Sequence, residues 1–374
     1  MSKPRVLVLH NRYRVRGGEE RAVELHVDAL ARAGVPHATL FRDSSDAGAL
    51  RAGRSLVRGG ERPEEVTDAA RELGAGVLHV HNMQPLFGPR ALEAGRAAGA
   101  RVVMHLHNYR LFCAIAVCFR DGAPCFRCHH GRTLPGFALN CRGSLPESAA
   151  YAYALSSQLE RVLAAVHTFI TPSEFARGQL ERLGLPAERV RVLPHYLEDE
   201  AFEPESRASE GSYALMYGRL SEEKGLPEGI EAARRAGVPL KVAGDGPLMD
   251  RLRDSGAELL GRVPAERLAE LRRGAAAVLV PSRSDETFGL AALEAMGAGV
   301  PVIATRAGAL PELVGDERCV PRGDVDAMAE RLRRLWNDAA LRSSDGEALL
   351  ARARERYTRE RFTGELLAIY AGAP

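Results

Sequence analysis

The residues best suited to chemistry lie in the stretch Ser284–Pro301, where two glutamates, Glu286 and Glu294, stand eight positions apart. The apolar run Ala277–Val280 predicts a strand that ends just before this stretch, and a helix is expected to begin near Gly289. The free backbone amides at the start of such a helix, with its positive dipole end, suit a diphosphate and need no metal. Glu294 would lie about one turn into the helix, where its carboxylate can accept two ribose hydroxyls. Each glutamate alone also fits a plainer interpretation, as a helix-entry acid or a solvated side chain.

Two cations follow another predicted strand, Ala214–Tyr217. They are Arg219 and Lys224, in the sequence Gly-Arg-Leu-Ser-Glu-Glu-Lys-Gly. Fixed cations of this kind stabilise the charge that develops on a leaving group without having to reorganise. Arginine supplies nearly all the positive charge of the chain, and Lys224 is one of three lysines, with Lys3 and Lys241. The alternative for an isolated lysine is a solvated surface residue.

Short apolar runs alternate with helical patterns along the whole chain, which indicates βαβ units and parallel sheets. In the first half, strands are expected at Arg5–Leu9, His37–Phe41, Gly76–Val80, Arg101–His105 and His167–Thr171, and helices at Gly18–Ala33, Pro63–Leu73, Pro89–Ala98 and Pro146–Ala165. In the second half, strands are expected at Ala214–Tyr217, Leu240–Ala243, Ala277–Val280 and Val300–Ala304. Each half is therefore expected to be a Rossmann-like α/β domain, and such sheets bind ligands beside the carboxyl ends of their strands.

The boundary between the two halves is expected near residue 195, because Arg189–Leu193 has the pattern of a last strand, Pro194 ends it and residues 198–211 are polar and acidic. This gives an N-terminal domain of residues 1–195 and a C-terminal domain of residues 196–355. The segment from about Arg352 to Tyr370 is expected to be helical and amphipathic, and residues 356–374 are expected to form a C-terminal helix that packs back on the first domain.

Composition excludes several classes of protein. With 374 residues, 45% hydrophobic and 27% charged, the chain is long enough for two globular domains. Its net charge of +2 argues against nucleic-acid binding. No apolar run approaches the ~20 residues of a membrane span, and Val6–Leu9 is too short for a signal peptide, so a cytoplasmic protein is expected. Gly244-Asp-Gly246 is followed by Met249 rather than a third glycine, and a P-loop is missing, which argues against dehydrogenases and P-loop kinases.

Together these motifs resemble the E-x7-E signature and the Gly-Arg…Lys-Gly segment of family-4 retaining glycosyltransferases of the GT-B fold, over essentially the whole chain. The resemblance implies two Rossmann-like domains facing a central cleft. It also implies that Glu286 contacts the hydroxyls of a donor sugar, Glu294 contacts the ribose, and Arg219 and Lys224 neutralise the diphosphate. No metal or other cofactor is implied for catalysis.

Further donor-binding residues come from the same resemblance. The catalytic set is expected to be His107, Glu286, Arg219 and Lys224. His107 follows the strand Arg101–His105 and matches the family's histidine near the anomeric carbon of the donor. Residues expected to line the nucleotide and sugar are Gly17, Gly18, Gly244, Gly261, Arg262, Val263, Thr287, Phe288, Gly289 and Leu290. His79, His81 and His105 are interpreted as strand-end packing or acceptor-pocket residues.

Five of the six cysteines fall between residues 113 and 141, within an irregular segment at residues 108–145. Cys113, Cys125, Cys128 and Cys141 have spacings that a structural zinc ion tolerates, and a subset of the family carries a similar insertion. Cys118, His129 and His130 are alternative ligands. Ordinary free thiols and a redox disulfide are the competing interpretations, and a permanent disulfide is not expected in the cytoplasm. Cys319 is expected to be a buried strand residue, and Asp324 a helix N-cap.

The acceptor side is less well defined. The expected acceptor residues are Glu19, Asn82, Asn108, Tyr109 and Arg110. Arg51, Arg54 and Arg58 share a helical face with Leu50 and Leu56, and this face could dock on anionic lipid, bind an anionic acceptor or simply be solvated. Two positions depart from the family pattern, Ala307-Gly308 in place of two glycines and Pro194-His-Tyr196 in place of Pro-Asn-Gly.

The sequence thus predicts a bacterial, metal-independent retaining glycosyltransferase, monomeric or homodimeric. Its donor would be a nucleoside diphosphate sugar, with a UDP-sugar such as UDP-GlcNAc or UDP-glucose favoured. Its acceptor would be a small molecule of secondary metabolism or a glycolipid of the cell envelope, in the cytoplasm or at the inner membrane. The rival hypotheses are a GT-B sugar-nucleotide epimerase, which turns over its donor without an acceptor, and a sugar-nucleotide-binding protein without activity.

Overall fold

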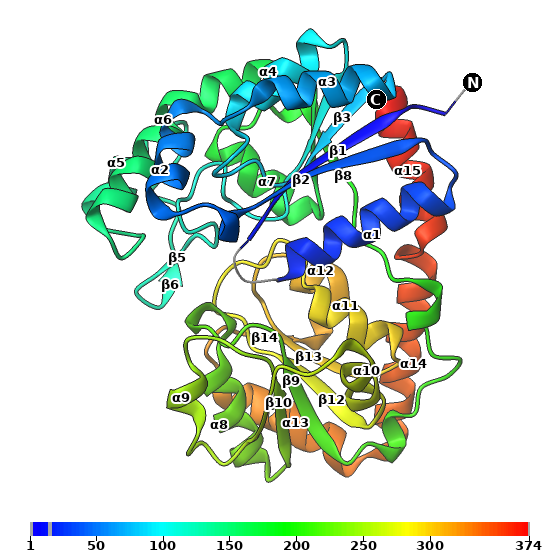
Figure 1. Ribbon diagram of the computed structural model, residues 1–374. Coiled ribbons are helices and arrows are strands. Elements are labelled where there is room, and N and C mark those ends of the chain that lie inside the picture. The colour runs from blue at the N-terminus through cyan, green and yellow to red at the C-terminus, as the bar shows by residue number, and fades with distance from the viewer. Residues whose placement is uncertain (1–2, 14–16, 373–374) are drawn as a thin grey trace. The chain divides into compact units, whose positions relative to one another are not determined.

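The computed structural model describes residues 3–13 and 17–372. Within these residues, none of the helices is both long and apolar enough to cross a membrane. Contacts divide the chain into two compact units (Figure 1). Unit 1 comprises Met1–Cys118, Cys125–Pro194 and Phe362–Pro374, and unit 2 comprises Phe119–Pro124 and His195–Arg361.

Unit 1 is built on a six-stranded parallel sheet in the order β2-β1-β3-β4-β7-β8. The strands are β1 (Val6–Arg12), β2 (His37–Asp43), β3 (Val77–Val80), β4 (Arg101–His105), β7 (Thr168–Thr171) and β8 (Val190–Val192). The helices are α1 (Gly18–Arg32), α2 (Ala49–Arg58), α3 (Pro63–Leu73), α4 (Gly88–Ala97), α5 (Leu134–Ala138), α6 (Leu145–Ala165), α7 (Glu174–Leu183) and α15 (Arg359–Ala371). Both faces of this sheet are covered by helices (Figure 1), which explains why the inner strands β1, β3, β4 and β7 are buried along nearly their whole length.

Alternation along β3 and β4 sends different side chains to the two faces of the sheet. Leu78, Val80, Val102 and Met104 pack into the core that contains the apolar faces of α3, α4 and α6. The intervening residues of β3 and β4 therefore point to the opposite face, where α1 and α15 lie side by side (Figure 1). Two of these intervening residues, His79 and His105, are histidines, and they are described below with their neighbours.

Unit 2 repeats the architecture with the sheet order β11-β10-β9-β12-β13-β14. Its strands are β9 (Tyr213–Tyr217), β10 (Leu240–Ala243), β11 (Glu258–Gly261), β12 (Ala275–Val280), β13 (Val302–Thr305) and β14 (Cys319–Val320). Its helices are α8 (Leu226–Ala236), α9 (Met249–Leu252), α10 (Ala265–Arg273), α11 (Leu290–Gly297), α12 (Leu310–Val314), α13 (Val325–Asn337) and α14 (Ala339–Arg356). One core lies beneath α8 and α13, and a second beneath α11, α12 and α14.

The predicted α/β class and the predicted strands are confirmed, each within three residues at its ends, with β1 extending three residues further than expected. The segment from Arg352 to Tyr370 is helical, as predicted, but it is divided between two helices. Helix α14 ends at Arg356 and α15 begins at Arg359, because Tyr357 and Thr358 leave the helical path to pair with Leu197, whose N–H donates to Tyr357 O at 2.9 Å. Asp324 caps α13 by accepting from Ala327 N, as predicted, and Cys319 is buried in β14.

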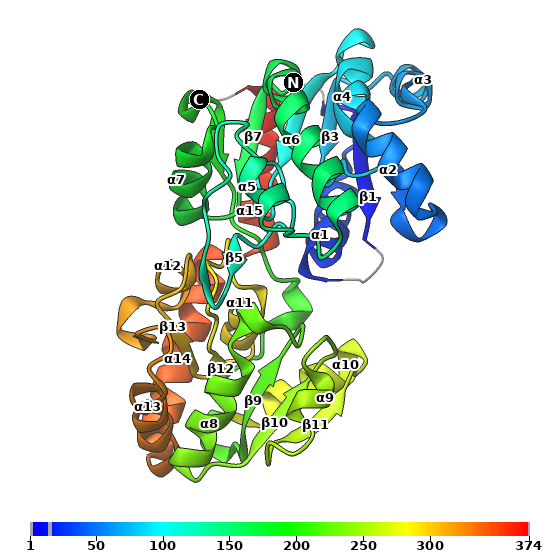
Figure 2. The same cartoon turned by 90° about the vertical axis from the view of Figure 1, so that its left-hand side faces the viewer.

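The cysteine-containing segment has little regular structure of its own. It forms a short antiparallel pair, β5 (Phe119–Arg120) with β6 (Ala123–Pro124), followed by α5 against α6 (Figure 2). The turn of this pair, Phe119–Pro124, is grouped with unit 2, while the segments on both sides of it belong to unit 1.

Candidate functional site

The predicted donor-binding residues gather at one edge of the unit 2 sheet. Because all six strands are parallel, the loops that follow β9, β10, β11, β12 and β13 leave the sheet at the same edge. These loops carry Arg219, Gly244, Arg262, Glu286 and Gly308 in turn. The sequence separations are large, but the topology brings these segments together.

An ion pair stands at the centre of this edge. Lys224 Nζ lies 2.7 Å from Glu286 Oε1, and Ser282 Oγ donates to the same oxygen at 2.5 Å. Burial raises the pKa of Glu286, but Lys224 and Ser282 outweigh it and the net pKa is lowered. Burial lowers the pKa of Lys224, but Glu286 reverses this and the net pKa is raised, with Arg219 as a nearby opposing charge. Both groups are therefore charged at neutral pH.

The position of Lys224 depends on a close backbone contact. Gly225 has φ +65°, and a Cβ there would overlap the carbonyl oxygen of Pro281. The amides of Arg283 and Ser284 both donate to Glu223 O, at 2.8 and 3.1 Å. Glycine at position 225 thus lets the segment before α8 dock on the segment after β12, which places the lysine beside the glutamate.

The loop that carries Glu286 is held in place by the segment that follows β13. Ala309 N donates to Glu286 O at 2.9 Å, and Gly308 N donates to Asp285 Oδ1 at 3.1 Å. Gly308 has φ +64°, and a Cβ there would overlap the backbone of Glu286. The Asp285 carboxylate also pairs with Arg322. The single glycine at Ala307-Gly308 therefore falls at the position where the backbone requires it.

Helix α11 begins at Leu290, as the sequence predicts, with Gly289 as its N-cap at φ +108°. The first amides of a helix have no partner within the helix, so this end can receive an anion. Phe288 is buried beneath it, with its ring edge-on to His195 at a centroid distance of 5.0 Å. Burial lowers the pKa of His195 to about 4, so this ring is neutral.

Glu294 has a partner that the sequence analysis missed. Arg272 Nη1 donates to Glu294 Oε2 at 3.0 Å, and the Arg272 guanidinium lies 5.6 Å from the centre of the Tyr217 ring. Tyr217 OH donates to Ala291 O at 2.5 Å, in the first turn of α11. Burial and Glu294 raise the pKa of Tyr217. Arg272 belongs to α10, and its spacing from Glu294 gives no sequence signal of the contact.

The remaining expected donor residues lie on neighbouring loops of unit 2. Gly218 N donates to Ala243 O at 3.0 Å and Gly244 N to Gly261 O at 2.7 Å, so the ends of β9, β10 and β11 are tied together by backbone bonds. Arg262 is exposed beside them. Val263 and Leu290 pack against the unit 2 core, and Thr287 lies in the loop before α11.

In unit 1, three of the expected acceptor residues, Glu19, Asn108 and Arg110, form one polar cluster with Tyr13. Glu19 Oε2 accepts from Tyr13 OH at 2.7 Å and from Asn108 Nδ2 at 2.6 Å, and Arg110 Nε donates to Tyr13 OH at 3.1 Å. Burial raises the pKa of Glu19 and of Tyr13. With His81, Gln84 and His107, these residues line a small cavity of about 30 Å³. Tyr13 was absent from the sequence-based set.

Other expected residues of unit 1 have mainly structural contacts. Asn82 Nδ2 donates to Asn11 O at 2.7 Å and Gln84 O at 3.0 Å, while its Oδ1 accepts from Gln84 N. Tyr109 is buried in the unit 1 core. Gly17 is the N-cap of α1 and Gly18 its first residue, and the Glu20 carboxylate accepts from the amides of Gly17 and Tyr13, both at 2.9 Å.

His107 lies at the end of a group of buried histidines on the α1 and α15 face of the sheet. Its Nε2 is 2.7 Å from His81 Nδ1. Among the described residues, two trios have ligand atoms close enough to hold a metal ion, His26 with His79 and His81, and His81 with His105 and His107. Both trios consist of histidines and neither contains a cysteine.

The five cysteines of the insertion lie within electrostatic reach of one another and form no disulfide. A hydrogen bond from Cys118 lowers the pKa of Cys113 to about 6, and burial raises the pKa of Cys128 to about 11. Cys125 N donates to Cys118 O at 2.6 Å, and Cys141 N donates to Gly136 O at 3.0 Å. Among the described residues, however, no three of these cysteines have sulfur atoms within 4.8 Å of one another, so the structure does not bring together the four sulfurs that were expected to bind zinc.

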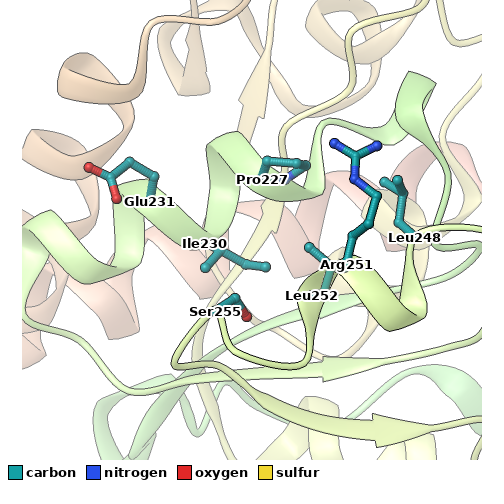
Figure 3. Close-up of a pocket in the computed structure, with 7 residues that line it drawn as sticks. All are labelled: Pro227, Ile230, Glu231, Leu248, Arg251, Leu252 and Ser255. Atoms are coloured by element: carbon teal, nitrogen blue, oxygen red, sulfur yellow. The ribbon is translucent and has the colours of Figure 1, made fainter.

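A larger hollow, of about 290 Å³, lies between α8 and α9 (Figure 3). Its lining combines apolar and charged side chains: Pro227, Ile230, Glu231, Leu248, Arg251, Leu252 and Ser255. Arg251 pairs with Glu222, and Glu231 with Arg234 and Arg235. None of the expected site residues lines this hollow, so its size alone does not make it the candidate site.

Comparison with known proteins agrees with this geometry. The model of glycosyltransferase family 4 matches residues 16–200, and that of the group 1 glycosyl transferases matches residues 198–351. An exopolysaccharide phosphotransferase of Streptomyces coelicolor is 34% identical over 201 residues, which are 49% of this chain and 21% of that protein. A putative colanic acid biosynthesis glycosyltransferase of Escherichia coli is 28% identical over 207 residues, 49% of this chain and 50% of that protein. The chain thus spans about a fifth to a half of the length of these curated relatives.

Among solved structures, Anabaena HepE in complex with UDP-glucose has a TM-score of 0.67 to this chain at 15% identity, over 99% of this chain and 100% of that one. A sucrose-phosphate synthase of Thermosynechococcus elongatus has a TM-score of 0.69 at 19% identity, over 99% of each chain. The two parallel six-stranded sheets and the two family models, which together extend from residue 16 to 351, show that this chain belongs to the family-4 glycosyltransferases of the GT-B fold.

Proposed function

We propose that the protein is a retaining glycosyltransferase that moves a sugar from a nucleoside diphosphate sugar to a hydroxyl of its acceptor. The observation that carries the proposal is the Lys224–Glu286 ion pair at the carboxyl edge of the unit 2 sheet, beside the N-terminus of α11. A cation, an anion and free helix amides at one point match the needs of a sugar diphosphate, whose phosphates are anionic and whose sugar hydroxyls are donors.

Each group then has a distinct task. Lys224, Arg219 and the amides of α11 hold the diphosphate and stabilise the charge that grows on it as the glycosidic bond breaks. Glu286 accepts hydrogen bonds from hydroxyls of the donor sugar and fixes its orientation. Glu294, held by Arg272, accepts from the ribose.

Retention follows if the acceptor hydroxyl attacks the face of the sugar that the diphosphate leaves. The departing phosphate oxygen can then take the proton of the incoming hydroxyl. No protein base is needed on that route, and no metal ion is needed because Lys224, Arg219 and the helix dipole supply the positive charge.

We propose UDP as the nucleotide, with UDP-glucose and UDP-GlcNAc as the first donors to test. The support comes from HepE, a structural relative described in complex with UDP and with UDP-glucose. The Tyr13, Glu19, Asn108 and Arg110 cluster of unit 1 is proposed to bind the acceptor, since its carboxylate and guanidinium can hold a polyhydroxylated molecule.

A lipid-linked acceptor is favoured over a soluble one by the surface of unit 1. The large apolar side chains that are exposed among the described residues all lie on α2, α5 and α6: Leu50, Val57, Leu134, Phe137, Leu145 and Tyr153. Leu50 is the extreme case at 92% exposure, and α2 also carries Arg51, Arg54 and Arg58 but no acid. Apolar residues beside arginines suit the interface of an anionic membrane.

Calorimetric titration with UDP, GDP and ADP, with and without EDTA, tests the donor site. Lys224→Ala should weaken binding of the cognate nucleotide at least tenfold, and EDTA should have no effect. Lys241→Ala is the matched control, because Lys241 of β10 pairs with Glu258 of β11 and lies over the Tyr213 ring, away from the site. It should bind as the unmodified protein does.

Failure of the folded protein to bind any of the three nucleotides would refute the proposal. Binding and donor turnover without an acceptor would favour the epimerase, and binding without any turnover would favour a non-catalytic binding protein. If transfer occurs, the anomeric configuration of the product, read by proton NMR, decides between retention and inversion.

A further inference from the structure

The hollow between α8 and α9 lies within unit 2 but outside the proposed donor site. Its volume of about 290 Å³ is near the lower end of the range for small-molecule sites. Three of its lining side chains, Ile230, Leu248 and Leu252, are apolar and no more than 7% exposed. The other apolar residue, Pro227, and the arginine, Arg251, are exposed (Figure 3). A molecule in this hollow would therefore meet both a buried apolar surface and a guanidinium.

The lining also contains a buried hydroxyl. Ser255 Oγ is buried and makes no hydrogen bond to any described residue, although the Ser255 amide donates to Leu252 O at 3.1 Å. A buried hydroxyl without a partner costs free energy. Because Ser255 lines the hollow, a polar group of a bound molecule can supply the missing partner.

The charges of the lining favour an anion. The Glu231 carboxylate accepts from Arg234 and Arg235 at 2.7 Å each, and its side chain points away from the other lining side chains in Figure 3. The Arg251 guanidinium pairs with the Glu222 carboxylate, but the two side chains are 66% and 50% exposed. Exposed pairs of this kind contribute little to stability. A carboxylate of a bound molecule can therefore replace that of Glu222 on Arg251.

One wall of the hollow is bonded to the loop that carries Arg219. Leu248 N donates to Leu220 O at 3.0 Å, and Leu220 N donates to Asp245 O at 2.9 Å. Leu220 directly follows Arg219 in the sequence. A displacement of Leu248 by a bound molecule would thus be passed through one backbone hydrogen bond to the neighbour of a donor-site cation.

The partner of Arg251 belongs to the same short turn as the donor-site lysine. Glu222 is the first residue and Lys224 the last residue of the single 3₁₀ turn that precedes α8. When Glu222 loses Arg251, its negative charge is no longer compensated. It then stands two positions from the lysine that pairs with Glu286.

We propose that this hollow is a regulatory site for a small carboxylic acid that has an apolar body and a second polar group. The carboxylate pairs with Arg251 in place of Glu222, the body covers Ile230 and Leu252, and the second polar group bonds to Ser255 Oγ. The Glu222 charge that is released weakens the binding of an anionic diphosphate. This last effect rests on the proposed function, whereas the binding of the acid does not.

NMR titration of methyl-labelled protein tests the site without any nucleotide. The probe is 4-hydroxyphenylacetate, which has a carboxylate, an apolar ring and a hydroxyl. The methyl signals of Ile230, Leu248 and Leu252 should shift to saturation at concentrations of about 20 mM or less. Phenylacetate lacks the hydroxyl and should bind about threefold more weakly. The neutral 4-hydroxyphenylethanol lacks the carboxylate and should bind about tenfold more weakly. Absence of a saturable shift, or equal affinities for the three probes, would overturn the proposal.

Variants at the rim of the hollow test the role of Arg251. Arg251→Met should weaken binding of 4-hydroxyphenylacetate about tenfold and leave that of the neutral probe unchanged. Glu222→Gln removes the competing carboxylate and should strengthen binding of the acid about threefold. Arg253→Met is the matched control, because Arg253 pairs with Asp250 and does not line the hollow. Equal losses in the two arginine variants, or weaker binding in Glu222→Gln, would overturn the assignment of Arg251.

Calorimetric titration with UDP in the presence of saturating 4-hydroxyphenylacetate tests the regulation. The Kd for UDP should rise about fivefold, and the rise should be absent in Arg251→Met. A Kd that does not change while the acid is bound would overturn the regulatory role. A protein that binds the acid but none of the three nucleotides would refute the proposed function and confirm the acid site, so the two proposals fail separately.

Discussion

Arg272 and Glu294 form a partly buried ion pair in which Nη1 of the arginine donates to Oε2 of the glutamate at 3.0 Å. The glutamate is therefore already oriented before any ligand arrives. This contact joins α10 to the first turns of α11 and gives Arg272 a role that the signature motif does not include.

Arg272→Met should weaken UDP binding about tenfold, which corresponds to about 1.4 kcal/mol. Without the Arg272 guanidinium, Glu294 would lose part of its orientation and its negative charge would be less compensated near the diphosphate. Isothermal calorimetry measures the effect. Arg273→Met is the neighbouring control, since Arg273 pairs with Glu203 instead, and equal losses in the two variants would contradict this role for Arg272.

Glu286→Gln should lower kcat at least a hundredfold while UDP binding changes less than threefold. The amide keeps the shape of the side chain but removes the charge that pairs with Lys224 and replaces one of the two acceptor oxygens by an NH₂ donor. Initial rates at saturating donor measure kcat. A large rise in KM with kcat unchanged would show that Glu286 binds the ground state and the transition state equally and does not accelerate the chemical step.

Gly308→Ala should destabilise unit 2 by about 3 kcal/mol or more, because a Cβ would overlap the backbone of Glu286 at a positive φ. Gly323→Ala is the matched control. Gly323 has φ +74° but nothing within 4 Å of its Cβ position, so only about 1 kcal/mol is expected. Urea denaturation followed by the fluorescence of Trp336, the single tryptophan, reports on unit 2. Equal losses of unfolding free energy in Gly308→Ala and Gly323→Ala would contradict an overlap of the Cβ with the backbone of Glu286.

The protein should lose stability as the pH falls below about 6.5, the usual pKa of histidine in an unfolded chain. His26, His79, His81 and His195 have lowered pKa values in the folded state, so protons bind the unfolded chain more tightly. Their stabilising effect is complete above about pH 6.5 and declines toward the folded pKa values, which are about 3 for His26 and about 4 for His195. Each histidine should contribute on the order of 2 kcal/mol of loss by pH 5.

Scanning calorimetry between pH 8 and pH 5 measures this loss. Three of these histidines belong to unit 1 and one to unit 2, so the transition of unit 1 should move further. His26→Asn should reduce that movement. Transition temperatures that do not change between pH 8 and pH 5 would contradict the neutral, buried state of these four histidines.

The purified protein should contain about one zinc ion per chain if the cysteine segment binds metal. Mass spectrometry of the metal content measures it. The Cys125→Ser/Cys128→Ser double variant should lose the zinc, and Cys319→Ser should keep it, because Cys319 lies in unit 2 on β14. Folded protein that contains no zinc would refute the zinc site predicted from the sequence.

The sequence predicted the positions of the site loops well, for a physical reason. Parallel strands place their carboxyl ends at one edge of a sheet, so residues after each predicted strand converge whatever their separation. This is why the segments that carry Arg219, Gly244, Glu286 and Gly308 could be assigned to one edge without knowing the helices between them.

The partners of these residues could not be predicted in the same way. Arg272 reaches Glu294 from another helix, and Ser282 reaches back from the end of a strand to Glu286. The group of buried histidines in unit 1 could be predicted in part from the sequence. His79 and His81, and likewise His105 and His107, are two positions apart at the ends of neighbouring strands, so their side chains share one face of the sheet. Its completion by His26 and Tyr370 depends on how α1 and α15 pack, which the sequence pattern does not specify.

The path of the chain has a consequence for biosynthesis. Helix α15 carries Phe362 and Tyr370 into unit 1 after the whole of His195–Arg361 has been made. During synthesis from the N-terminus, the earlier residues of unit 1 leave the ribosome without this helix, and the buried His26 of α1 and His79 of β3 lack the Tyr370 hydroxyl that both bind. Unit 2 can complete its sheet first, and the part of the protein that is translated earliest is the last to be finished.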